Sequence, residues 1–154
     1  MTQLITRLNL AHTKTAQRIL TIQRLAYRIE ADLIDFDGIP QLHESLAELQ
    51  ASSETFLGYH VNKTIAGVLS YEIDDTTLDI GRLVVHPDHF RKGIGRQLVQ
   101  HVETIPHITK IIVSTGARNK PACNLYESLG YTHTDTREIL AGLTIAFYEK
   151  IKTN

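Results

Sequence analysis

The segment Leu78–Glu103 constrains the fold most, because its sequence changes from a strand pattern to a glycine-containing turn and then to a helix pattern. Leu83–Val85 is an apolar strand-like run, and Pro87 ends it, since proline cannot donate a ladder hydrogen bond. Beyond the turn, apolar residues recur at helical spacing, at Ile94, Leu98, Val102 and Ile105. Gly93 and Gly95 therefore lie at a helix N-terminus, where backbone N–H groups are unpaired and can bind phosphate.

A pyrophosphate suits this loop, because the two glycines allow close approach to the backbone and the helix dipole favours negative charge. Arg91, Lys92 and Arg96 add positive charge. The alternative is a packing turn between strand and helix whose cations are solvated. No Gly-Lys-Ser/Thr follows, which excludes a P-loop, and GxGxxG is incomplete, which argues against a dinucleotide fingerprint.

The remaining sequence predicts one α/β domain over residues 1–154. Strands 78–85 and 110–115 are joined by a helix, which predicts a parallel βαβ unit inside a mixed, mostly antiparallel sheet with helices on both faces. The expected helices begin at residues 13, 41, 94 and 119, the second covering 41–50 and the third reaching residue 105. The first should bury one apolar stripe: Ile19, Ile22, Ala26, Ile29 and Leu33. The other expected strands are 4–8, 55–61, 64–73, 131–138 and 143–151.

Composition excludes several classes of function. The 16 lysines and arginines and 17 aspartates and glutamates give a net charge of −1, which argues against nucleic-acid or membrane partners. Cys123 is the only cysteine, so a disulfide framework is impossible, and the histidines show no metal-binding spacing. No apolar run approaches the ~18 residues of a membrane span. The first ten residues do not resemble a signal peptide, so a cytoplasmic location is expected.

A second motif lies in residues 119–131, where Tyr126 follows Leu125 on a predicted helix that opens at Asn119. Taken alone, a helical tyrosine is more often a packing residue than a catalytic one. Together and in this order, however, the two motifs resemble the GNAT superfamily of N-acetyltransferases. That family has a Val-x-Pro strand end and an Arg/Gln-x-x-Gly-x-Gly/Ala loop, and it later has Asn-x-x-Ala-x-x-Leu-Tyr-x-x-x-Gly-Phe/Tyr. The matching positions are Val85, Pro87, Gly93, Gly95, Asn119, Ala122, Leu125, Tyr126, Gly130 and Tyr131. Phe90 stands where the family has Arg or Gln.

The resemblance implies acetyl-CoA as co-substrate, no metal, and acetyl transfer to a primary amine of a small molecule or peptide. Tyr126 matches the general acid, and a backbone N–H near Val84 or Val85 would polarise the acyl oxygen. The general base is open: Asp79 is the first candidate, Glu72 and His86 are rivals, and water is a fourth possibility. The residues expected to contact the cofactor are Leu83, Val84, Val85, Arg91, Lys92, Gly93, Ile94, Gly95, Arg96, Gln97, Asn119, Ala122 and Tyr126.

The resemblance also indicates where the acceptor binds. Family members build the acceptor pocket from the region that here contains Phe36, Ile39, Pro40, Leu42 and Glu44. With Asp35 and Asp37 nearby, this region suits a small cationic amine. A homodimer is compatible with the resemblance, because many relatives dimerise. The alternative function is a GNAT-fold module that binds acyl-CoA without turnover and serves regulation or interaction.

Overall fold

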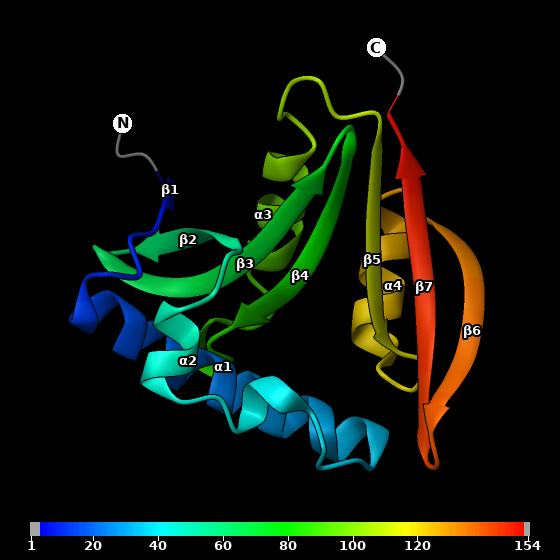
Figure 1. Ribbon diagram of the computed structural model, residues 1–154, viewed down its shortest axis with the longest axis horizontal. Helices are drawn as coiled ribbons and strands as arrows, with labels where there is room; N and C mark the ends of the chain where they lie inside the picture. The colour runs from blue at the N-terminus through cyan, green and yellow to red at the C-terminus, as the bar shows by residue number, and fades with distance from the viewer. Residues whose placement is uncertain (1–3, 153–154) are drawn as a thin grey trace.

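A mixed seven-stranded sheet forms the centre of the fold, in the order β1-β2-β3-β4-β5-β7-β6 (Figure 1). The computed structural model describes residues 4–152. In this part of the chain only β4 and β5 pair in parallel, which confirms the predicted βαβ unit. The strands are β1 (Ile5–Arg7), β2 (Thr55–Val61), β3 (Thr64–Asp74), β4 (Thr77–Val85), β5 (Lys110–Gly116), β6 (Thr132–Leu140) and β7 (Leu143–Ile151).

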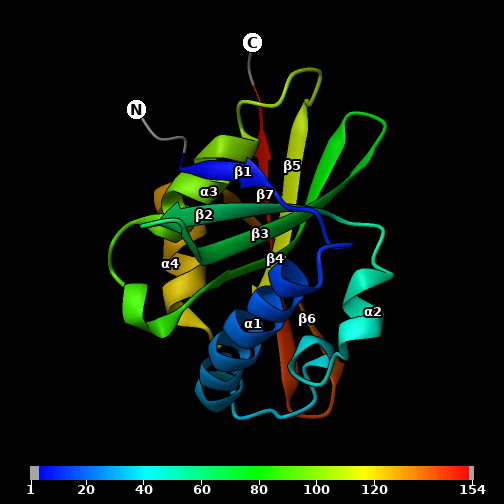
Figure 2. The same ribbon diagram turned by 90° about the vertical axis from the view of Figure 1, so that its left-hand side faces the viewer.

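Helices cover both faces of the sheet, as expected (Figures 1 and 2). Helices α1 (Thr13–Ile34) and α2 (Leu46–Gln50) lie on one face, and α3 (Ile94–Val102) and α4 (Lys120–Ser128) lie on the other. Each pair of helices covers its own apolar core. No helix within residues 4–152 is both long and apolar enough to cross a membrane.

Two predicted helices are shorter than expected. The helix predicted over 41–50 is instead a 3-10 turn, η1 (Pro40–Leu42), followed by α2. Ser45 explains this start, because its side chain accepts from the amide of Glu48 while the Glu48 carboxylate accepts from the Ser45 amide, a capping box. Helix α3 ends at Val102 rather than at residue 105.

The buried stripe predicted for α1 is wrong in its second half. Ile19 and Ile22 are fully buried, but Ile29 and Leu33 are 37% and 44% exposed. The buried face instead continues through Tyr27 to residue 34. This half of α1 runs along a cavity, and the two exposed side chains line it. They therefore have no sheet beneath them to pack against.

Strands β4 and β5 diverge after a short parallel ladder. They pair only from Thr77 with Lys110 to Ile80 with Val113. Beyond these pairs β4 continues along β3 and β5 continues along β7, so residues 81–85 and 114–116 have no strand partner on their facing edges. Gly81 has no partner on β3 either, which makes it a β-bulge at the point of divergence. The sheet therefore opens at its centre.

Candidate active site

The open edge of β4 presents two backbone amides. The amide of His86 donates to the Ala66 carbonyl of β3, at 2.8 Å. Because amides alternate in direction along a strand, those of Leu83 and Val85 point away from β3, toward the opening, while that of Val84 points toward β3. Of the two amides expected to face the acyl oxygen, the structure thus directs Val85 toward the opening and Val84 away from it.

The glycine loop forms a set of unpaired amides beside this opening. Gly93 is the N-cap of α3 with φ of 75°, a left-handed conformation that favours glycine. The first backbone hydrogen bond of the helix runs from the Gln97 amide to the Gly93 carbonyl, at 3.0 Å. Within residues 4–152, the amides of residues 91–96 have no acceptor. A Cβ on Gly95 would approach only Leu125 and Leu83, at 3.6 and 3.7 Å, so protein packing does not require glycine there.

The cations of the loop divide into two groups. Arg91 and Arg96 line the cavity next to the loop, and Arg96 also donates to the Ser128 hydroxyl at 2.7 Å. Lys92 lies near His89 on the exposed surface, and neither Lys92 nor Gln97 lines the cavity. Phe90, in place of the family's polar residue, lines the cavity and is 43% exposed.

Two cavities meet at the opening in the sheet. The larger, about 540 Å³, lies between the glycine loop, residues 83–85, α1 and the start of α4. The smaller, about 250 Å³, lies between α1, the segment after it, and strands β4, β5 and β7. The residues that line both are Tyr27, Glu30, Leu83, Asn119 and Ala122, so one groove passes through the opening.

Tyr126 projects from α4 into the smaller cavity. The side chain is 3% exposed and its ring packs edge-on against Tyr131, with ring centroids 5.8 Å apart. Its hydroxyl has no hydrogen-bond partner in the described part of the chain. Burial, together with the negative charge of Glu30, raises the pKa of Tyr126 well above its usual value. The phenol therefore stays protonated at neutral pH and can donate.

Asn119 connects α4 to α1. Its Oδ1 accepts from the Ala122 amide at 3.3 Å, which caps α4. Its Nδ2 donates to Glu30 at 3.1 Å. Both polar atoms of this amide thus have protein partners, and the side chain fixes the carboxylate of Glu30 at the junction of the two cavities.

The structure brings none of the three candidate bases into the groove. Asp79 lines a separate hollow of about 210 Å³ together with Arg137 and Phe147. Desolvation and the charges of Glu72 and then Glu54 raise the pKa of Asp79. Glu72 pairs with Asp79 across β3 and β4. His86 accepts from the Asp88 amide and lines neither cavity.

Sequence reasoning did not select three residues that line the groove: Tyr27, Glu30 and Arg82. Two of them carry a signal that helical spacing provides. Tyr27, Glu30 and Ile34 are three and four residues apart and share one face of α1. Arg82 lies among apolar residues in the second half of its strand, where a charge requires buried partners.

Arg82 is the centre of a polar network that joins β4 to α1 and to the segments on either side of α2. It is 5% exposed and binds Glu44 and Glu54, each at 2.7 Å. Gln23 accepts from it at 3.1 Å, and Ser70 donates to Glu54. A Cβ on Gly81 would lie 2.3 Å from Glu54, so the bulge beside the opening depends on glycine and this network.

Replacing Arg82 by Met should destabilise the fold by about 3–5 kcal/mol at neutral pH, because the partly buried Glu44 and Glu54 lose their cation. Burial alone would raise the pKa of Glu54, but hydrogen bonds from Arg82 and Ser70 outweigh it and hold that pKa below its usual value. The stabilisation is therefore present above the usual pKa and disappears as the pH falls through the lowered one. Urea unfolding should show the difference between wild type and Arg82→Met narrowing in acid.

A suitable control is Arg28→Met, which removes an exposed ion pair with Asp37. Such pairs contribute about 0–1 kcal/mol. Equal losses for both variants, or a difference that does not change with pH, would contradict the role assigned to the Arg82 network.

The acceptor region is less acidic than the sequence suggests. Phe36, Ile39 and Pro40 line the smaller cavity, but Leu42 does not. Of the acidic side chains expected there, none lines it: Glu44 binds Arg82, Asp37 binds Arg28, and Asp35 is the exposed C-cap of α1. Within residues 4–152, no three His, Cys, Asp or Glu side chains are grouped in the manner of a metal site.

Comparison with known proteins identifies the family of this chain. The model of the acetyltransferase (GNAT) family matches residues 17–131, so the chain belongs to that family. The UPF0157 protein YqkA of Bacillus subtilis (strain 168) is 46% identical over 136 residues, which are 86% of this chain and 39% of that protein. The chain thus spans about two fifths of the length of that relative.

Solved structures share the fold. The PaiA N-acetyltransferase of Thermoplasma acidophilum, in complex with coenzyme A, superimposes with a TM-score of 0.79 at 18% identity, covering 99% of this chain and 100% of that one. The putative acetyltransferase YncA of Salmonella typhimurium, with its cofactor acetyl-CoA, gives a TM-score of 0.70 at 18% identity, covering 98% and 94%.

Proposed function

We propose that this chain is an N-acetyltransferase that moves an acetyl group from acetyl-CoA to a primary amine. The observation that carries the proposal is the continuous groove through the opened sheet. One end of the groove has unpaired amides and two arginines, and the smaller cavity is lined by Tyr126, whose hydroxyl has no hydrogen-bond partner within residues 4–152. The family supports the same chemistry.

The residues of the larger cavity fit acetyl-CoA. The free amides of residues 91–96 and the side chains of Arg91 and Arg96 suit its pyrophosphate. The open edge of β4, at Leu83 and Val85, suits the amide groups of its pantetheine arm, which would bind as an added strand. When bound, acetyl-CoA supplies the acetyl group as a thioester, whose carbonyl carbon is open to attack by a neutral amine.

The chain's own groups serve each change of charge in this transfer. The new C–N bond forms as the C–S bond breaks, and an outward amide of β4 stabilises the oxygen of the attacked carbonyl. Tyr126 donates its phenolic proton to the departing sulfur, and it regains a proton from the nitrogen that has become an amide. The acceptor amine is an ammonium ion in solution and must lose one proton before it can attack. The site therefore needs a proton acceptor for this first step.

The proposal is tested by release of free thiol from acetyl-CoA in the presence of a panel of primary amines, polyamines and peptides. We expect thiol release that depends on the amine, with the acetylated product identified by mass spectrometry. Tight acetyl-CoA binding with no thiol release for any amine would overturn the proposal and favour a silent acyl-CoA-binding module. Absence of acetyl-CoA binding would contradict both.

Phe90→Arg should leave acetyl-CoA binding unchanged or strengthen it by up to about tenfold, because the variant adds a cation at the edge of the anion-binding loop. The Phe90 side chain is already partly exposed, so little packing is lost. Isothermal titration with acetyl-CoA measures the effect, and raised salt should reduce any gain. Weaker binding would show that Phe90 itself contacts the ligand in a way that arginine cannot replace.

A further inference from the structure

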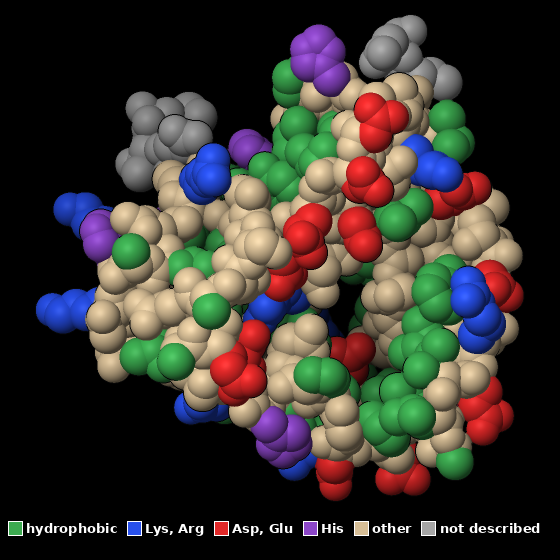
Figure 3. All heavy atoms as spheres, in the orientation of Figure 1, with side chains coloured by type: hydrophobic (Ala, Val, Ile, Leu, Met, Phe, Trp, Pro, Cys, Tyr) green, Lys and Arg blue, Asp and Glu red, His purple; other side chains and the backbone are tan. Residues whose placement is uncertain are grey.

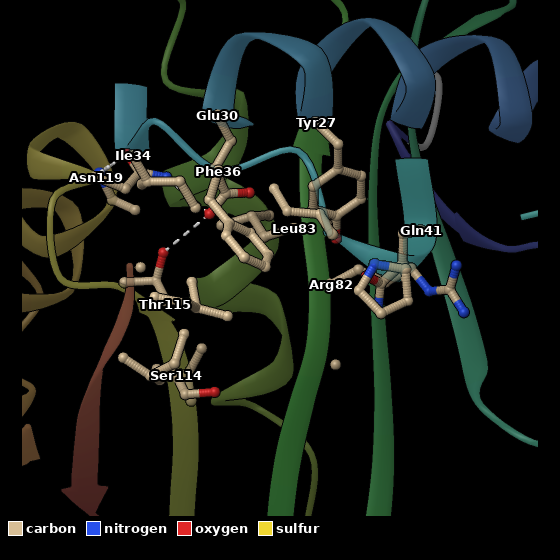
Figure 4. A pocket seen from close by; sticks show the side chains of 18 of the residues that line it. Tyr27, Glu30, Ile34, Phe36, Gln41, Arg82, Leu83, Ser114, Thr115 and Asn119 are labelled. Carbon is tan, nitrogen blue, oxygen red and sulfur yellow. Dashed lines mark hydrogen bonds between the residues drawn. The ribbon is translucent and has the colours of Figure 1, made fainter. Parts of the chain in front are cut away.

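Glu30 occupies the junction of the two cavities and has one free carboxylate oxygen. It projects from α1 into the groove, beside Phe36 and Thr115 (Figure 4). Asn119 and Thr115 both donate to the same oxygen, Oε1, at 3.1 and 3.4 Å. In the described part of the chain, Oε2 has no hydrogen bond and Glu30 has no salt bridge.

The charge of Glu30 is not offset by the other charged residue of the smaller cavity. Arg82 lines that cavity, but its guanidinium already binds both Glu44 and Glu54. The donors to Glu30 are a neutral amide and a neutral hydroxyl. The cavity therefore presents one negative charge, which is typical of a site for a single cation.

Two largely buried phenols line the smaller cavity. Tyr27 is 8% exposed, lines both cavities, and has no hydrogen-bond partner for its hydroxyl in residues 4–152. Tyr126 shares these features within the smaller cavity. Burial, and after it the negative charge of Glu30, raises the pKa of both phenols. A hydroxyl that opens into a cavity without a protein partner is free to bind a ligand or water.

The smaller cavity is small, and one part of its wall is apolar. Its walls include Phe36, Ile39, Val113 and Ile145, and its volume of about 250 Å³ lies below the ~300–1,000 Å³ of common ligand pockets. A compact apolar group fits such walls, whereas a second ammonium group would find no second uncompensated carboxylate there.

We propose that Glu30 is the acceptor-binding and proton-accepting residue, and that the acceptor is a compact monocationic primary amine with an apolar body. This inference rests on the proposed function. Oε2 of Glu30 binds the ammonium group and takes one proton from it, which gives a neutral amine and a carboxylic acid. The amine nitrogen then attacks the thioester carbon as described above, and Glu30 returns its proton to solvent. The apolar body lies against Phe36 and Ile39.

An acidic outer surface offers a competing way to select the acceptor. Acidic side chains gather on the face that Figure 3 shows. Glu72 and Asp79 are exposed and lie opposite each other on β3 and β4, an unfavourable pair of like charges. Such a surface would favour a polycation. Two probes separate the possibilities. 2-Phenylethylamine has one positive charge and a compact apolar body, whereas spermidine has several positive charges and no compact apolar body.

The test uses the Glu30→Gln variant, which preserves the shape of the side chain and its contacts. With 2-phenylethylamine we expect kcat/KM to fall about 10- to 100-fold. Affinity for acetyl-CoA should not change, and calorimetric binding of 2-phenylethylamine to the CoA-loaded protein should weaken. The effect should shrink for phenylhydrazine, which is neutral at the assay pH and needs no proton acceptor. Asp32→Asn, an exposed acid on the same helix outside both cavities, is the control.

The outcomes distinguish this inference from the function on which it rests. Wild-type thiol release with equal kcat/KM for Glu30→Gln would overturn the role of Glu30 and leave the acetyltransferase intact. Preference for spermidine over 2-phenylethylamine would overturn the substrate class and favour the acidic outer surface. If no amine releases thiol and 2-phenylethylamine does not bind, both the function and this inference fail.

Discussion

Gly95→Glu should abolish acetyl-CoA binding while leaving the protein folded. The glycine lies among the free amides at the start of α3, where the pyrophosphate is expected. Two like charges about 4 Å apart repel by about 4 kcal/mol at an effective dielectric constant near 20. Since about 1.4 kcal/mol is a factor of ten, the dissociation constant should rise by about three orders of magnitude. Isothermal titration calorimetry measures the loss.

Two further variants separate the causes of that effect. Gly95→Ala adds bulk without charge, and its Cβ makes only ordinary contacts with Leu125 and Leu83, so any loss of affinity reports contact with the ligand itself. Gln100→Glu adds the same charge further along α3, on an exposed side chain, and should bind nearly as the wild type does. Full binding by Gly95→Glu, at an unchanged melting temperature, would mean that the anion site lies elsewhere.

Tyr126→Phe should lower kcat by about 10²–10⁴-fold, the usual contribution of a positioned acid, with little change in acetyl-CoA affinity. The hydroxyl has no hydrogen-bond partner in the described residues, so its removal should not destabilise the fold. The raised pKa of Tyr126 predicts no loss of rate from its deprotonation as the pH rises through the range of ordinary assays. Steady-state and single-turnover measurements separate the chemical step from binding.

Tyr131→Phe is the matched control in the same aromatic cluster. The Tyr131 hydroxyl donates to Glu103 at 3.0 Å, so this variant should lose about 0.5–3 kcal/mol of stability but little of kcat. The two variants should thus show opposite behaviour in unfolding and in turnover. If both lower kcat equally, Tyr126 acts through packing and not as a proton donor.

Much of the fold follows from patterns within short segments. The Leu83–Val85 run, the glycine loop and the helix that begins at Ile94 predict a parallel unit, and the structure confirms it. The position of Ser45 ahead of Glu48 carries the signal that α2 starts late. Such features depend on neighbours in sequence, which is why they can be predicted.

The features that depend on contacts between distant segments were not predictable. The residue types at Ser114 and Thr115 do not indicate that β5 stops pairing with β4 at this point and continues to pair with β7 alone. The bulge at Gly81 reverses the facing of β4, so Ile80 and Leu83, three residues apart, both pack on the α3 and α4 side. The number of residues between Asp79 and the glycine loop therefore does not reveal that Asp79 lines a different hollow. Kinetic measurements on variants of Asp79 and Glu30 would test which of the two acts as the general base.

The opening also divides the sheet into two groups of strands. Strands β1–β4 form one part of the sheet and strands β5–β7 form the other, and within residues 4–152 the only ladder between them is the short run from Thr77–Lys110 to Ile80–Val113. A ligand that binds the free strand edges of both parts would link them. At a concentration of 100 times its dissociation constant, such a ligand adds about 2.7 kcal/mol to the free energy of unfolding. The stability of this protein against unfolding should therefore rise with the fraction of it that has ligand bound.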